Sequence, residues 1–288
     1  MSLLNVIVLA IVQGLAELLP VSSSAHVVVA EKLMGLDPSS PPMTLLLVML
    51  HTGTMFAVVA YFWRQWRSTY FQSAVAFKDF AGRVVVATAL TAVIGEIIIK
   101  IIEKTLLRDV PHSEIEDLFS HLEFIAPALA VGGLLILAAG IFEKRKSAKN
   151  SPATDELTMR RAALIGMIQG LCLPFRGFSR SGATISTGML LGMQKSRAET
   201  FSFALAVVIT PPVVAREVMR LMRAPHLESS DLSSVMLLSL LGAVLAFFAG
   251  LLALRWLSKW LESGRWYLFG IYCLVAAAAV SFLHQSGY

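Results

Sequence analysis

QGLCLPFRGFSRSGAT, residues 169–184, places two arginines, two serines and a threonine inside an apolar part of the chain, with LIGMI before it and MLLGM soon after it. An arginine at the centre of a bilayer costs roughly 2.5–3.5 kcal/mol. A membrane segment that carries two of them therefore indicates a site and not a plain membrane span. The alternative is an ordinary cytoplasmic loop with scattered basic residues.

The polar residues of this segment fall where one short helix ends and the next begins. The break from Pro174 to Gly177 is expected to end the first helix, so that Ser179, Arg180 and Ser181 open the second. A helix N-terminus presents free N–H groups and the positive end of the helix dipole. Backbone N–H donors beside a guanidinium are an arrangement that binds phosphate. The segment therefore predicts an anion site.

The composition is that of an integral membrane protein. Of the 288 residues, 56% are hydrophobic and 15% are charged, against about 25% charged in an average soluble domain. The net charge of +5 comes from basic residues spread over short loops, so no nucleic-acid partner is predicted. Cys172 and Cys273 show no metal-ligand spacing, and neither a zinc site nor a disulfide framework is indicated.

Six apolar runs are long enough to cross a hydrocarbon core of about 30 Å as helices: 43–63, 84–102, 124–142, 200–222, 233–256 and 266–284. Two more apolar regions, 3–36 and 162–193, are broken in the middle by proline and serine. Their halves are too short to span, so we expect re-entrant helical hairpins, whose tips need cover from protein or a water-filled cavity. The expected fold class is an all-α integral membrane protein with six transmembrane helices plus two re-entrant hairpins.

An internal repeat relates the two hairpins. The same interval separates Gln13-Gly14-Leu15 from Gln169-Gly170-Leu171, Ser23 from Ser179, Thr44 from Thr200 and Arg64 from Arg220. The two halves, about 1–145 and 158–288, are expected to form a single membrane domain joined by a cytoplasmic loop. Each half holds one hairpin and three spans. Because three is odd, the second half must lie upside down relative to the first, an inverted-topology repeat in which the two hairpins meet at one site.

The loop charges predict the orientation of the chain. Lysines and arginines concentrate in loops 64–83, 143–161 and 255–265, which are therefore expected on the cytoplasmic side. Loops 103–122 and 223–232 carry acidic residues and fall on the outer side by alternation, as do both termini. The first hairpin then enters from outside and the second from the cytoplasm.

The first hairpin holds the side chains that could carry out chemistry. Gln13 and Glu17 are four apart and share a helix face, and Ser23 and His26 follow where a new helix should begin. Taken alone, the serines could be N-caps and the histidine a hydrogen-bonded residue of the bundle. The repeat should bring this tip against residues 179–181, and the combined groups would form a phosphoryl-transfer site.

Three motifs resemble those of one family, the undecaprenyl-diphosphate phosphatases, also called bacitracin-resistance proteins. Gln13 with Glu17 is similar to the family's E/Q-x-x-x-E motif, LPVSSSAH at 19–26 to its serine and histidine element, and GFSRSGAT at 177–184 to its P-G-x-S-R-S-G-A-T motif. The resemblance covers essentially the whole chain. It implies hydrolysis of the terminal phosphate of C55 polyisoprenyl diphosphate, which recycles the cell-wall lipid carrier and confers bacitracin resistance. It also implies a bacterial inner membrane location, with the active site on the periplasmic or outer side.

The resemblance also implies a role for each matching residue. The implied catalytic residues are Glu17, Ser23 as nucleophile, His26 as acid/base or alternative nucleophile, and Arg180; the implied phosphate ligands are Ser22, Ser179, Arg180, Ser181 and Thr184; and the implied ligands of a divalent cation, Mg²⁺ or Ca²⁺, are Glu17 and Gln13. The chain departs from the family pattern at Gln13, where many members have glutamate, at Ala25, where many have glycine, and at Arg176, where the motif has proline.

Several alternatives stay open. A transporter or flippase of polyisoprenyl phosphate or another lipid phosphate would also use paired broken helices, but a carrier needs no nucleophile such as Ser23. Whether Ser23, His26 or water attacks the phosphorus is not decided by the sequence. His51, in the first full span, could line the site or be an ordinary bundle histidine. The expected partners are the lipid diphosphate and the bilayer, with a homodimer as a further option.

Overall fold

The computed structural model describes residues 2–38, 40–105, 122–148, 153–223, 229–261 and 264–286. Nearly all of them are helical, and they contain no β-strand. The helices are α1 Leu3–Leu18, α2 Ser23–Leu33, α3 Pro41–Thr69, α4 Ala74–Thr105, α5 Leu122–Ala148, α6 Met159–Cys172, α7 Arg180–Leu190, α8 Lys195–Arg223, α9 Ser229–Leu261 and α10 Tyr267–Gln285. The predicted all-α fold is confirmed.

Six of these helices, α3, α4, α5, α8, α9 and α10, are long and apolar enough to cross a membrane. They coincide with the six predicted runs, so the chain is a multi-pass membrane protein. One boundary differs clearly, because α4 begins at Ala74 and not near residue 84. Its first turns carry Lys78, Asp79 and Arg83 among apolar residues, and the ion pair between Asp79 and Arg83 at 3.8 Å, one helical turn apart, suits a helix that continues beyond the predicted run.

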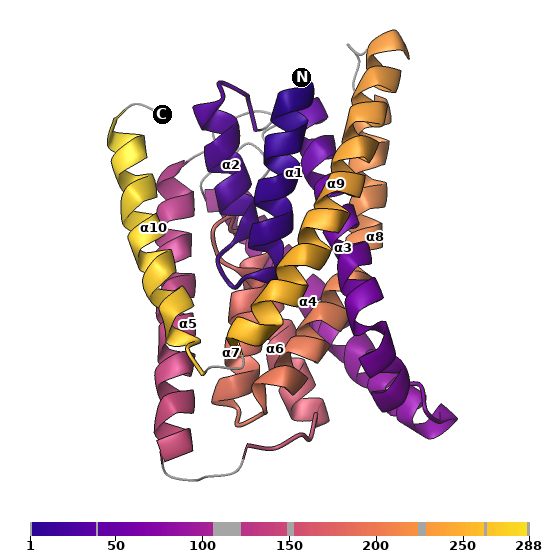
Figure 1. Cartoon of the computed structure of the whole chain (residues 1–288), viewed down its shortest axis with the longest axis vertical. Coiled ribbons are helices and arrows are strands. Elements are labelled where there is room, and N and C mark those ends of the chain that lie inside the picture. The colour runs from indigo at the N-terminus through magenta and orange to yellow at the C-terminus, as the bar shows by residue number, and fades with distance from the viewer. Residues whose placement is uncertain are drawn as a thin grey trace.

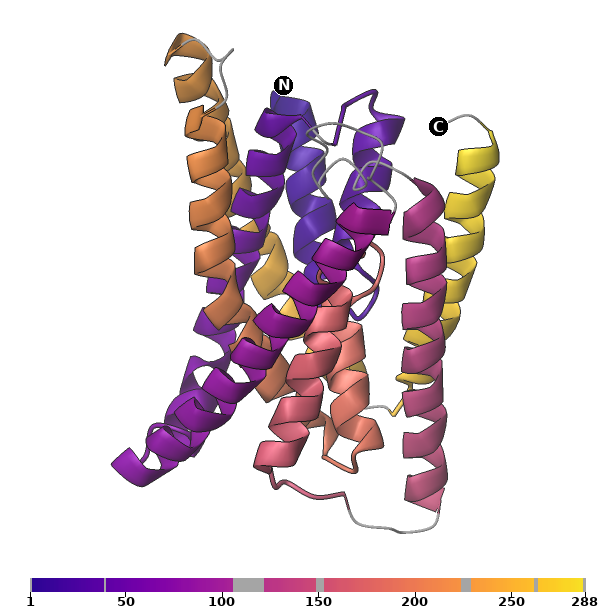
Figure 2. The same cartoon turned by 180° about the vertical axis from the view of Figure 1, so that it is seen from behind.

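Each of the two broken regions forms a pair of short helices, α1 with α2 and α6 with α7. Proline disfavours helical backbone in the residue before it, and Leu19 before Pro20 is extended and ends α1. Figures 1 and 2 show α1 and α2 in the half of the bundle where α10 ends, with α6 and α7 in the opposite half. The two tips meet, since the Ser181 hydroxyl lies 3.4 Å from the Leu19 carbonyl oxygen, to which it donates.

Each short pair packs against a long helix from the other half of the sequence, α1 against α9 and α6 against α4. Glycine permits the close approach in both places. A Cβ atom on Gly14 would lie 2.4 Å from the Cβ of Ala249, and one on Gly170 would lie 2.8 Å from the Cβ of Ile94. Small residues let membrane helices approach closely without a side chain between them. The long helices therefore fix the depth at which the tips lie.

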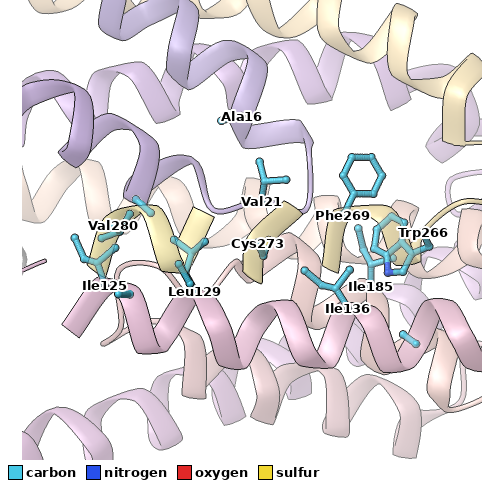
Figure 3. Close-up of a cluster of buried hydrophobic side chains, with 14 of the residues drawn as sticks. Ala16, Val21, Ile125, Leu129, Ile136, Ile185, Trp266, Phe269, Cys273 and Val280 are labelled. Carbon is cyan, nitrogen blue, oxygen red and sulfur yellow. The ribbon is translucent and has the colours of Figure 1, made fainter. Parts of the chain in front are cut away.

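A hydrophobic cluster anchors the first tip to the bundle. Val21 of the tip packs with Ile136 of α5, Ile185 of α7 and Trp266 at the start of α10 in the cluster that Figure 3 shows. The Trp266 indole N–H donates to the Ser186 hydroxyl at 3.0 Å, which satisfies both buried polar groups. The tip of the first pair is thus held by α5, α7 and α10 together.

Candidate active site

A cavity of about 280 Å³ lies between the two tips and helices α3 and α8. Its polar lining comes mainly from the tips and from α3: Glu17, Ser22, Ser23, Ser24, Arg176, Ser179, Arg180, Ser181, Thr44, His51 and Thr54. The apolar lining comes mostly from α3 and α8: Leu47, Val48, Met55, Val58, Phe203, Ala206, Val207, Ile209, Val213 and Val214. One side of the cavity can therefore bind an anion and the other a hydrocarbon chain.

The carboxylate of Glu17 is the centre of the polar side. Its Oε1 accepts a hydrogen bond from Arg180 Nη2 at 2.6 Å, across the contact between the two tips. Its Oε2 accepts from the Ser23 hydroxyl at 2.5 Å and from Gln13 Nε2 at 3.0 Å. His51 Nε2 lies 3.4 Å from the same Oε2. The structure thus brings Gln13, Glu17, Ser23 and Arg180 together, as the sequence predicted, and adds His51.

Ser23 occupies the first position of α2, directly after a strained residue. Ser22 has φ 65° and ψ 86°, and among the described residues it is the one non-glycine residue with positive φ. Such a backbone costs of order 1–3 kcal/mol and is concentrated at functional sites. The Ser22 side chain makes no capping hydrogen bond to α2. The strained turn sets Ser23 against Glu17 and leaves the first N–H groups of α2 without a side-chain cap.

The start of α7 differs from the start of α2, although the two are equivalent in the predicted repeat. The Ser179 hydroxyl caps α7 by accepting from the Gly182 N–H at 3.1 Å. Ser179 and Ser181 both line the cavity, but each already has a partner in the protein, since Ser181 donates to the Leu19 carbonyl. Arg180 is thus the charged side chain that α7 presents to the cavity.

Thr184 lies behind the cavity. It is fully buried and is not among the residues that line the cavity. Its hydroxyl bonds to the Arg180 carbonyl at 2.8 Å and to the Ser202 hydroxyl of α8 at 2.6 Å. This geometry ties the first turn of α7 to α8, which stabilises the backbone that carries Arg180.

His26 faces away from Glu17. Its Nδ1 donates to the Ser22 carbonyl at 2.8 Å, because a carbonyl can only accept, and its Nε2 lies 2.6 Å from the Tyr272 hydroxyl of α10. The two rings are stacked, with centroids 5.7 Å apart and an interplanar angle of 9°. His26 does not line the cavity. Its acid/base role stays a prediction, and the structure places it where it holds the Ser22 backbone.

His51 is the histidine that lines the cavity. Its Nδ1 donates to the Leu47 carbonyl at 2.8 Å, which directs Nε2 toward Glu17. The sequence left the position of this histidine open. The available signal was the run of polar residues His51, Thr52 and Thr54 in an otherwise apolar span.

The described residues do not include a group of three or more histidine, cysteine, aspartate or glutamate side chains that could hold a metal ion. Glu17 is the one carboxylate in the described lining of the cavity, and Gln13 is fully buried outside that lining. The Gln13 Oε1 atom is buried without a hydrogen-bond partner in this part of the chain. Mg²⁺ commonly takes one or two protein carboxylates and completes its shell with substrate phosphates and water. This donor set fits a cation that arrives with a phosphate ligand, not a centre built by protein alone.

Comparisons with known proteins agree with the motifs. The family model described as "Bacitracin resistance protein BacA" matches residues 6–279. The chain is 53% identical over 284 residues to Undecaprenyl-diphosphatase 2 of Acinetobacter baylyi, with 97% of each chain covered. It is 31% identical over 285 residues to Undecaprenyl-diphosphatase of Rhodopirellula baltica, with 98% of each chain covered. These relatives do not favour the transporter alternative.

Proposed function

The chain belongs to the bacitracin resistance protein family, as its motifs indicated, and from this we propose that it is an undecaprenyl-diphosphatase. The enzyme would remove the terminal phosphate of C55 polyisoprenyl diphosphate and return the lipid monophosphate. The observation that carries this proposal is the contact of Ser23 and Arg180 with the two oxygens of one carboxylate, Glu17, at the wall of a cavity. A nucleophile, its base and a phosphate-binding cation are the parts that phosphoryl transfer needs.

In the proposed reaction the Ser23 hydroxyl attacks the terminal phosphorus. The bond between Ser23 Oγ and phosphorus forms as the bond from phosphorus to the bridging oxygen breaks, and the lipid monophosphate leaves. Glu17, which accepts the hydrogen bond of this hydroxyl, takes its proton. Water then attacks the phosphoserine, Glu17 takes a proton from that water after releasing the first to solvent, and Ser23 regains a proton as orthophosphate leaves.

Arg180 and His51 would stabilise the transferring group. The guanidinium of Arg180 can exchange one Glu17 oxygen for phosphoryl oxygens, to which it forms paired hydrogen bonds. His51 Nε2, close to Glu17, is placed to relay the proton that Glu17 receives. If water attacks directly, the same carboxylate would orient that water. Either route uses Glu17 as the base.

A divalent cation, Mg²⁺ or Ca²⁺, is proposed to enter with the diphosphate and to bind Glu17 as its protein ligand. When bound, such an ion would neutralise negative charge on the phosphate oxygens. Gln13 supports this arrangement indirectly, because its amide N–H donates to Glu17 and fixes the carboxylate. The roles proposed for Ser23 and Arg180 follow from the contacts of the protein side chains alone.

We propose that the site opens to the outer side of the bacterial inner membrane, with α1–α2 and α6–α7 as re-entrant hairpins of an inverted repeat. The basic loops support this orientation, and the position of the two pairs in opposite halves of the bundle supports the inverted repeat (Figure 1). The matching close approaches at Gly14 and Gly170 support the repeat. The loop 103–122 lies almost wholly outside the described residues. The described cavity lining comes from one chain, so a homodimer, which stays a prediction, would not be needed to complete it.

The apolar wall of α3 and α8 is proposed to hold the isoprene units next to the diphosphate, while the rest of the C55 chain lies in the bilayer. A lining of valine, leucine and phenylalanine matches a branched hydrocarbon and cannot distinguish its exact length.

Phosphate release from C55 polyisoprenyl diphosphate by purified protein tests the function, with and without chelator. We expect release by the wild type and a loss of release with chelator. No phosphate release, together with movement of the lipid between vesicle leaflets, would instead establish the carrier alternative. If chelator does not change the release of phosphate, the protein is a phosphatase that does not need a divalent cation.

A further inference from the structure

Arg176 is a second arginine at the same cavity, and this chain carries it where the resembled motif has proline. It lies at the tip between α6 and α7, four residues before Arg180. The following residue, Gly177, has φ +111°, and a Cβ there would lie 2.5 Å from the Ile125 carbonyl oxygen of α5. The backbone beside Arg176 is therefore held tightly against α5.

Glu31 of α2 is a buried carboxyl group outside the cavity lining. It is 1% exposed, and neither of its carboxyl oxygens has a hydrogen-bond partner among the described residues. Burial raises the pKa of Glu31 to about 8, against the smaller opposing effect of the Arg176 charge. Glu31 is therefore mostly protonated at neutral pH and does not act as a counter-charge of Arg176.

The charges around the cavity show what Arg176 adds. Arg180 is already paired with Glu17 at 2.6 Å, so these two groups contribute little net charge. A lipid diphosphate carries one more ionised phosphoryl group than a monophosphate. Arg176 is the second arginine in the described lining. A guanidinium binds phosphoryl oxygens through paired hydrogen bonds, for which a lysine is a poor substitute.

We propose that Arg176 is a second phosphate-binding residue, which makes the site of this chain selective for diphosphates over monophosphates. The proposal rests on the proposed function and deepens it. Arg180 binds the terminal phosphoryl group that is transferred, and Arg176 binds the phosphoryl group that stays on the lipid.

Binding of inorganic pyrophosphate and of orthophosphate to purified protein tests this without requiring turnover. Loss of a charged hydrogen-bonding group should weaken pyrophosphate binding by Arg176→Ala about tenfold or more. Orthophosphate, which needs only Arg180, should change by less than about twofold, within the range of a weak, solvent-screened charge effect. Arg64→Ala, at an exposed position of α3, is the matched control and should change neither affinity.

If Arg176→Ala fails to fold, Arg176→Gln keeps a polar side chain at this position without the charge. This variant should still lose the preference for pyrophosphate.

Equal weakening of both anions by Arg176→Ala, or no weakening of either, would overturn the role of Arg176. If the wild type hydrolyses the lipid diphosphate and either of these binding results is found, the protein is a phosphatase and only the role of Arg176 is rejected. Selective loss of pyrophosphate binding in a protein that releases no phosphate from lipid diphosphate would support the diphosphate site and reject the phosphatase.

Discussion

Ser23 Oγ lies 2.5 Å from Glu17 Oε2 and donates its hydrogen to it, although the two residues lie on either side of the tip between α1 and α2. This contact joins the proposed nucleophile and the proposed base before substrate arrives. We therefore expect Ser23→Ala and Glu17→Gln each to lower turnover at least about 10²-fold. Acid quench followed by phosphoamino-acid analysis identifies the attacking group. Phosphoserine supports Ser23, whereas an active Ser23→Ala variant without any adduct would show that water attacks.

His26→Ala is likewise expected to lower turnover at least about 10²-fold, the general range for an acid/base group. An acid-labile phosphohistidine would make His26 the nucleophile. If His26 instead acts by holding the Ser22 backbone, Tyr272→Phe, which removes the hydroxyl next to Nε2, should lower turnover in the same direction. Normal turnover in His26→Ala would exclude both roles.

His51→Ala is expected to reduce kcat more than it changes KM, because Nε2 lies 3.4 Å from the carboxylate of Glu17, the proposed base. An amide can keep a hydrogen bond to Glu17 but cannot relay a proton. His51→Gln with wild-type kcat would therefore reduce His51 to a hydrogen-bond donor. His284→Ala, at an exposed position near the end of α10, serves as the control and should leave kcat unchanged.

Arg180→Lys is expected to lose most activity although the charge is kept. Lysine cannot form the planar fork that binds a phosphoryl group through two hydrogen bonds. Steady-state kinetics with the lipid diphosphate measure the effect. Near-normal turnover would mean that Arg180 supplies only positive charge to Glu17 and the substrate.

Gly14→Ala and Gly170→Ala are expected to destabilise the protein by about 1–3 kcal/mol each, the usual cost of overpacking a tight contact. The new Cβ atoms would lie 2.4 Å and 2.8 Å from the nearest atoms of α9 and α4. Thermal melting in detergent measures the change. Gly82→Ala in α4, where nothing lies within 4 Å of the new Cβ, is the control and should not lower the melting temperature. Equal melting of all three variants would contradict the role of the two contacts.

Single cysteines test the proposed orientation. Ser286→Cys, after the end of α10, should react with an impermeant thiol reagent in intact cells, and Ser147→Cys, at the exposed end of α5, should react only after lysis. The native residues Cys172 and Cys273 are buried and should remain unlabelled. Labelling of Ser147→Cys in intact cells would reverse the topology.

The sequence predicted the spans and the two broken regions because hydrophobic length and proline act locally. It also predicted that Glu17, Ser23 and Arg180 meet, because the repeat related the two tips. It could not show which way His26 points, since the left-handed backbone of Ser22 and the contact with Tyr272 set that direction.

The packing of α1 against α9 also bears on how the protein is made. Chain synthesis runs at about 5–20 residues per second, so α9 emerges tens of seconds or less after α1 has entered the membrane. During that interval the Gly14 face has no partner helix. The N-terminal half released on its own would carry Glu17 and Ser23 without the helix that fixes their depth. Membrane insertases or lipid must cover this face until translation of the second half is nearly complete.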